Sequence, residues 1–132
     1  MSASSVAFEL SASGSLARTT IGADQQLRVG YARIQANGAG TPPAGIAVFG
    51  FRSNGVLVSE TGVPAVSPSR TGRIYAETTG VVRTGLAITN PNSEAVTLSF
   101  YFTDAQGQNF GGGTTVLEAN RQTAAFLDEQ PF

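Results

Sequence analysis

The residue types needed for acyl transfer are incomplete in this chain. Serine and threonine hydroxyls are plentiful, but the sequence contains no histidine, cysteine or lysine. A serine or threonine nucleophile needs an adjacent base, and thiol chemistry or a thiolate metal site needs cysteine. The hydroxyls are therefore interpreted as solvent-facing groups of strands and turns, and no catalytic residue is predicted.

Carboxylates are the remaining groups that could perform acid–base chemistry. The chain has nine aspartate and glutamate residues, and a pair of carboxylates can hydrolyse a glycosidic bond without histidine. Such an enzyme usually needs a large cleft with aromatic platforms, whereas this sequence has no tryptophan and three tyrosines. Most of the carboxylates fall at expected strand ends or turns, so we interpret them as solvated and expect a non-enzymatic protein.

Two segments resemble ion-binding or phosphate-binding loops in part. Asp104, Gln106 and Gln108 alternate as ligands of a calcium loop do, but they offer one charge and no closing bidentate glutamate. The GGGTT run at 111–115 lacks the lysine of a phosphate-binding loop and precedes an expected strand instead of a helix. We therefore predict a plain turn and a glycine-rich break, and no metal or cofactor site.

The tyrosines leave one ligand chemistry open. Tyr75 and Tyr101 are expected to point outward from strands, where their rings could stack against the CH faces of a sugar. An exposed tyrosine on a sheet also serves cross-strand packing. Tyr75 and Tyr101 are thus the candidate ligand face of an alternative function, a carbohydrate-binding module.

Charge and hydropathy restrict the partners. Net charge is −1, only 13% of residues are charged, and all eight cations are arginine. This balance argues against a nucleic-acid or anionic-membrane surface. No run approaches the roughly 18 apolar residues that span a bilayer, so no membrane insertion is expected. The first 15 residues do not resemble an intact signal peptide, yet the polar, charge-poor composition is typical of proteins outside the cell. We therefore expect an extracellular or cell-surface location.

The length of the chain and the spacing of its turn-forming residues predict the fold class. A chain of 132 residues that is 41% hydrophobic is expected to form one domain that buries roughly two-thirds of its unfolded surface. Clusters rich in glycine, proline, serine and asparagine separate segments of about 5–10 residues, which is typical of an all-β sandwich or barrel. The sequence predicts a single antiparallel β-sandwich, Ig-like or jelly-roll-like, of about 7–10 strands.

The clearest predicted strand is 95–104, where Val96, Leu98, Phe100 and Phe102 alternate with polar residues. The nearly continuous apolar segment 46–52 predicts a strand covered on both faces or central to its sheet, followed by a hairpin turn at the Asn-Gly pair 54–55. The other expected strands are 6–10, 26–36 (with a bulge or a crossing between sheets), 55–60, 72–77 (with Ile74 buried), 83–90, 114–119 and 122–127. A short helical turn is expected at 127–130.

Several of these segments resemble a recurrent module of large bacterial secreted and surface proteins. The quoted residues are TGLAITNP at 84–91, the alternating strand 95–104, Gly107, the leucine-to-alanine segment 117–119 and QTAAFL at 122–127. The segments 30–34 and 45–51 resemble the preceding half of that module, so the likeness covers 26–130. The resemblance implies an uncharacterised Ig-like β-sandwich module without catalytic residues. It implies that Thr84, Gly85, Asn90 and Pro91 are turn and packing positions.

The N-terminal residues fall outside the resemblance and are treated as a separate part. We expect residues 1–25 to form a strand or arm and residues 26–132 to form the sandwich domain. In the arm, Val6, Phe8 and Leu10 alternate with Ala7 and Glu9. That pattern suits either a first strand of the same domain or a strand donated to the sheet edge of another subunit.

The expected function is a non-enzymatic structural or adhesive module of a bacterial exported or surface protein. It is expected to assemble through edge strands into a filament or layer. Its expected partners are other copies of itself or neighbouring domains, with polysaccharide as the partner under the alternative function.

Overall fold

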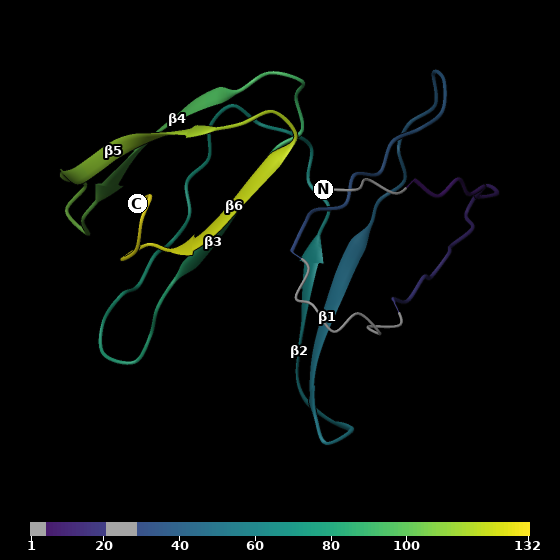
Figure 1. The fold of residues 1–132 in the computed structure, drawn as a ribbon, viewed down its shortest axis with the longest axis horizontal. Helices are drawn as coiled ribbons and strands as arrows, with labels where there is room; N and C mark the ends of the chain where they lie inside the picture. The colour runs from purple at the N-terminus through teal and green to yellow at the C-terminus, as the bar shows by residue number, and fades with distance from the viewer. Residues whose placement is uncertain (1–4, 21–28) are drawn as a thin grey trace.

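The structure is a computed structural model that describes residues 5–20 and 29–132. Over these residues the chain forms six strands and no helix (Figure 1). They pair in three antiparallel, two-stranded sheets with the orders β1–β2, β3–β6 and β4–β5. The strands are β1 (Ile46–Ser53), β2 (Val56–Pro64), β3 (Gly85–Asn90), β4 (Val96–Thr103), β5 (Asn109–Leu117) and β6 (Arg121–Phe126). The predicted all-β class is confirmed, although the described residues contain fewer strands than the expected seven to ten.

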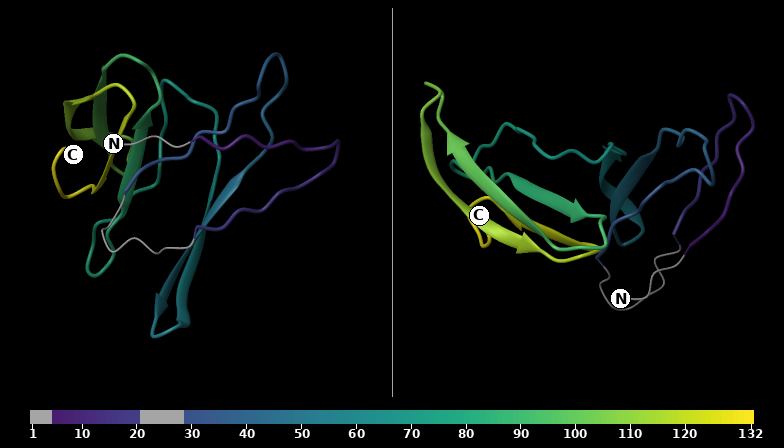
Figure 2. Two further views of the ribbon diagram at one scale, coloured as in Figure 1. Left: turned by 45° about the vertical axis from the view of Figure 1, so that its right-hand side comes forward. Right: turned by 90° about the horizontal axis from the view of Figure 1, so that it is seen from above.

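The hairpin β1–β2 forms where the Asn-Gly pair predicts it. Asn54 and Gly55 have φ values of 50° and 80°, the left-handed conformation that a tight two-residue turn requires at both positions. The pairing shifts by one residue between Phe51 and Arg52. This hairpin projects away from the C-terminal sheets in every view (Figures 1 and 2). All of its residues are exposed, so the expectation of a strand covered on both faces is wrong.

The hairpin β4–β5 confirms the predicted alternation. Val96, Leu98, Phe100 and Phe102 are half-buried, whereas Thr97, Ser99 and Tyr101 are exposed. The predicted turn after β4 is also present: one carboxylate oxygen of Asp104 accepts from the backbone N–H groups of Gln106 at 2.9 Å and Gln108 at 2.8 Å. The Asp104 carbonyl accepts from the Gly107 N–H at 3.0 Å. Asp104 therefore serves as a turn-forming residue.

The glycine run 111–113 lies inside β5, so the expected break there is wrong. Tyr101 pairs with Gly112 and Phe102 pairs with Phe110, which leaves Gly111 as an extra residue with φ 55°. This is a β-bulge, in which glycine supplies the left-handed conformation. A Cβ at Gly113 would lie 3.0 Å from the ring of Phe100, and one at Gly111 3.4 Å from the ring of Phe102. The glycines thus give the phenylalanine rings of β4 room to lie across β5.

Asn90 joins the end of β3 to the end of β5. Its side-chain Nδ2 donates to the carbonyls of Glu94 (2.7 Å), Leu117 (3.0 Å) and Glu118 (3.2 Å). Its Oδ1 accepts from the N–H of Asn92 at 3.1 Å, which is the predicted Asx turn. With 2% of its surface exposed, Asn90 is the most buried side chain of the described residues. A single amide therefore satisfies backbone groups from three segments.

The chain after β6 forms successive turns where a helical turn was expected. The Glu129 N–H donates to the Phe126 carbonyl at 3.0 Å, and the Phe132 N–H donates to the Glu129 carbonyl at 2.9 Å. Neither bond belongs to a helix. The Glu129 carboxylate accepts from the Phe126 N–H at 3.4 Å, and residue 131 is a proline without an N–H to donate. These local bonds hold the tail in turns, and its last ring packs edge-on against Phe100 at 5.5 Å.

Three expected strands are not formed as predicted. Residues 6–10 and 72–77 have no strand pairing, and Ile74, expected to be buried, is 52% exposed. The prediction for 26–36 is wrong over 29–36, and its first three residues lie outside the described part. Segment 72–77 is held by the hydrogen bond from Arg73 to the Tyr101 hydroxyl and, at its end, by hydrogen bonds between Thr84 and the backbone of Glu77. These segments alternate hydrophobic and polar residues, but no strand within 5–20 and 29–132 pairs with them.

Burial is concentrated in a small centre between β3, β4 and β5. Among the described residues, Leu117 is the one large apolar side chain classed as buried, at 6% exposure. The solvent-accessible surface of the chain is 11543 Å², whereas a monomeric globular protein of this mass exposes about 6,600 Å². The expected burial of two-thirds of the unfolded surface is therefore wrong for the single chain, which exposes apolar residues that a closed domain would cover.

Candidate functional site

The candidate site consists of exposed apolar surfaces and open sheet edges. Because each sheet has two strands over the part of the chain that the structure describes, each strand pairs along one edge only. A free edge offers backbone N–H and C=O groups that can pair with another strand.

Val6, Phe8 and Leu10 lie in a segment without strand pairing and are 60%, 41% and 37% exposed. The segment ends at a turn in which the Gly14 N–H donates to the Ser11 carbonyl at 2.9 Å. Its alternate residues keep the pattern of a strand, and residues 5–10 form no backbone hydrogen bond with any other residue of 5–20 or 29–132. Whether it does so in another copy stays a prediction.

Tyr75 and Tyr101 are both exposed, at 84% and 58%. Arg73 donates from Nη2 to the Tyr101 hydroxyl at 3.5 Å, and the Tyr75 hydroxyl donates to the Glu77 carboxylate at 3.3 Å. Arg73 thereby connects the segment that carries Tyr75 to the outer face of β4. The two tyrosines belong to neighbouring segments, with polar groups beside each hydroxyl.

The hairpin β1–β2 carries many exposed large apolar residues, although the sequence predicted that β1 would be covered on both faces or central to its sheet. Register puts Phe49 and Phe51 on one face of β1, opposite Thr61 and Ser59. The exposed apolar residues of the hairpin are Ile46 (66%), Val48 (57%), Phe49 (60%), Phe51 (63%), Val56 (66%), Leu57 (41%), Val58 (59%) and Val63 (52%). Large exposed apolar patches on soluble proteins mark interaction sites.

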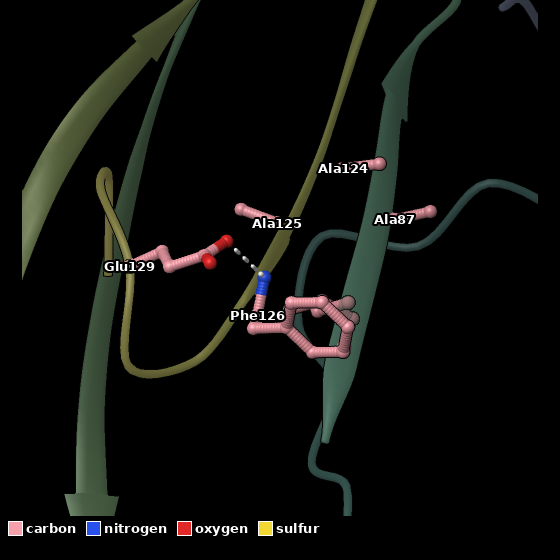
Figure 3. A pocket seen from close by; sticks show the side chains of 7 residues that line it. Ala87, Ala124, Ala125, Phe126 and Glu129 are labelled. Atoms are coloured by element: carbon pink, nitrogen blue, oxygen red, sulfur yellow. Dashed lines mark hydrogen bonds between the residues drawn. The ribbon is translucent and has the colours of Figure 1, made fainter. Parts of the chain in front are cut away.

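A shallow apolar hollow of about 360 Å³ lies on the β3–β6 pair (Figure 3). It is lined by Gly85, Leu86, Ala87, Ala124, Ala125, Phe126 and Glu129. Small residues leave the hollow open: Ala87 pairs with Ala124, and Gly85 lies opposite Phe126. Sequence reasoning assigned no functional role to these residues, since alternating small residues in a strand are also typical of close packing.

An ion-pair cluster holds the rim of the hollow. Arg83 donates to both carboxylate oxygens of Asp128 at 2.7–3.2 Å and to Glu129 at 2.9 Å. Its guanidinium carbon lies 4.1 Å from the centroid of the Phe126 ring. The hydrogen bonds from Arg83 hold the pKa of Asp128 below its usual value and raise that of Arg83. Arg83 thus fixes the C-terminal turns beside the ring.

This cluster predicts an acid-dependent loosening of the tail. Because the folded-state pKa of Asp128 is depressed, its contribution to stability is complete above the unfolded pKa and is lost as pH falls through the folded value. Arg83→Gln should return the Asp128 pKa toward its ordinary value in a carboxyl-carbon NMR titration. Arg121→Gln, at the other end of β6, serves as the control. An unchanged Asp128 titration in Arg83→Gln would contradict this account of the cluster.

No group of three or more acidic residues that could hold a metal ion lies within 5–20 and 29–132. Over the same ranges no helix is long and apolar enough to cross a membrane. Comparison of the chain with protein-family models, curated proteins and solved structures finds no match. The function proposed below therefore rests on how the exposed surfaces are arranged.

Proposed function

We propose that this chain is a non-enzymatic structural or adhesive module of a bacterial exported or surface protein, and that it self-assembles. The observation that carries the proposal is the accessible surface of 11543 Å², about 5,000 Å² more than a monomeric globule of this mass exposes. Obligate subunit interfaces bury about 2,000–5,000 Å² in total. Half of such an area lies on each partner, so the excess on one chain is larger than a single obligate interface covers and leaves room for more than one contact.

The architecture supports assembly through sheet edges. A two-stranded sheet is marginally stable in water, and three or more strands with one covered face are needed for independent stability. The described residues form three such pairs. In the proposed assembly, strands and apolar faces of neighbouring copies complete the pairs into an Ig-like sandwich. The resemblance to secreted bacterial modules supports the extracellular or cell-surface location.

The N-terminal segment is the proposed strand donor, and Phe8→Asp tests it. A charge on its apolar face should impair assembly, because the aspartate would have to be buried against the acceptor sheet. Light scattering should show a lower mean mass at equal concentration. Ala7→Asp introduces the same charge on the opposite face and should leave the mass unchanged. Equal masses for the Phe8→Asp variant and the unmodified chain would refute this route of assembly.

A second candidate function is supported by Tyr75 and Tyr101, whose exposed rings lie in segments joined by Arg73. Under this alternative the module binds carbohydrate. Tyr75→Ala and Tyr101→Ala should each lower retention on insoluble polysaccharide at least tenfold, because each removes a stacking surface. Tyr31→Ala is the matched control. Retention that neither substitution changes would end this alternative.

A further inference from the structure

The hairpin face carrying Phe49 and Phe51 and the hollow on β3–β6 are complementary surfaces of one molecule. The face presents two neighbouring phenylalanine rings that are 60% and 63% exposed. The hollow is an open depression of about 360 Å³ with one charged lining residue, Glu129. We infer that Phe49 and Phe51 of one copy dock into the β3–β6 hollow of a second copy. This inference rests on the proposed function and names the contact that would drive it.

The floor of the hollow suits a flat aromatic ring. Ala87 and Ala124 lie directly opposite one another, and their side chains reach only a Cβ above the sheet (Figure 3). At one end Phe126 forms a wall. A Cβ on Gly85 would lie 3.5 Å from the Phe126 ring, an ordinary van der Waals contact, so the ring lies directly beside position 85. An entering ring would therefore meet an alanine floor and an aromatic wall, the geometry in which offset or edge-to-face pairs form.

The rim of the hollow is fixed before docking. Arg83 contacts the Phe126 ring and binds both Asp128 and Glu129. Glu129 also accepts from the Phe126 N–H, which is on the edge of β6 away from β3. These contacts hold the aromatic wall in place and satisfy the Glu129 carboxylate. A docking ring thus meets a preformed surface and leaves no new charge without a partner.

The two surfaces lie on different elements, which determines the symmetry of the assembly. The hairpin lies apart from the β3–β6 pair (Figures 1 and 2), and its two phenylalanines are exposed and accessible to another molecule. Docking of one copy leaves its own hollow and its partner's hairpin free. Such a head-to-tail contact repeats into a filament, or into a ring where the rotation closes. A standard interface buries about 800 Å² on each partner, so two contacts on each copy fit within the excess surface.

The test uses two complementary variants of the full chain. The Phe49→Asp/Phe51→Asp variant loses the docking rings and keeps the hollow. The Ala87→Leu variant fills the hollow and keeps the rings, and Ala124→Arg is a second variant with the same purpose. Circular dichroism identifies a variant that fails to fold, and the other hollow variant then replaces it. Matched controls are Ser67→Asp, an exposed loop residue outside both surfaces, and Thr89→Leu, on β3 outside the hollow.

Sedimentation velocity should show that each docking variant alone needs at least tenfold higher concentration to assemble than the unmodified chain. An equimolar mixture of a ring variant and a hollow variant should form species with the mass of two copies, because one intact hairpin meets one intact hollow. The controls should assemble like the unmodified chain.

If the unmodified chain assembles and the mixture behaves like the separate variants, the inference fails and the proposed function stands. A folded hollow variant that assembles at the same concentration as the unmodified chain also overturns the inference. An unmodified chain that never assembles contradicts the proposed function itself.

Discussion

Replacing Asn90 by aspartate should lower the free energy of unfolding by at least about 3 kcal/mol, because the buried amide is a hydrogen-bond donor to three carbonyls. Aspartate has the same shape but places a second acceptor oxygen against those carbonyls. Each buried group left without a partner costs about 1–3 kcal/mol, and a charged one costs more. Since whole domains are stable by only about 5–15 kcal/mol, this single atom exchange should remove a large part of the stability.

The measurement is urea unfolding followed by circular dichroism, with the midpoint compared at neutral pH. Asn90→Ala should also destabilise the protein, but by less than aspartate, since it adds no charge. Asn92→Asp is the matched control, because in this network Asn92 uses its backbone N–H and C=O and not its side chain. Its midpoint should change by less than the equivalent of about 0.5 kcal/mol, as for surface substitutions. Equal midpoints for the two aspartate variants would contradict the proposed role of Asn90.

Gly112→Ala should destabilise the β4–β5 hairpin by about 2–4 kcal/mol, the range of substitutions that strain the backbone at special φ/ψ values. Gly112 has φ 152°, and a Cβ there would lie 2.6 Å from the Phe100 carbonyl oxygen and 3.2 Å from the Tyr101 Cα. These neighbours are backbone atoms of β4, so no side-chain rotation relieves the overlap. The strands must separate or the bulge must move.

The same unfolding experiment tests this prediction, with Gly72→Ala as the control. A Cβ at Gly72 meets nothing within 4 Å, and its φ lies outside the left-handed region. Gly72→Ala should therefore be neutral or slightly stabilising, because alanine restricts the unfolded chain. A Gly112→Ala variant as stable as Gly72→Ala would show that β5 does not form the bulge described at Gly111.

Local patterns in the sequence predicted the hairpins well. The alternation around Phe100 identified β4 and its half-buried face, Asn54 and Gly55 marked a turn, and Asp104 marked another. Each of these features is determined by residues close together in the chain. Sequence reasoning treated Asn90 as a turn and packing position, but its bonds to Leu117 and Glu118 depend on a contact across 27 and 28 residues, which periodicity does not encode.

The incorrect predictions concern features that depend on residues far apart in the chain or on another surface. The apolar segment 46–52 was predicted to be covered on both faces, and Ile74 to be buried, because hydrophobic side chains usually lie inside a domain. In the single chain they are exposed. The sequence pattern of these residues indicates that they are buried. It does not indicate whether the surface that covers them belongs to the same chain or to another copy. The glycines of β5 were interpreted as a break in the strand. Their role depends on the phenylalanine rings that lie across them, and these rings come from another strand, β4.

The small residues of the hollow were not identified either. Gly85, Ala87 and Ala124 are ordinary strand residues until the β3–β6 register places them together. Such a depression results from pairing between segments more than 30 residues apart. Only the three-dimensional arrangement relates it to the phenylalanines of β1.

The central claim is that the surface left open by one chain is covered by other copies. Sedimentation velocity of the purified, unmodified chain across a hundredfold concentration range tests it most directly. We expect species heavier than one copy that increase with concentration and dissociate on dilution. A sharp, compact boundary at the mass of a single chain throughout that range would contradict the account.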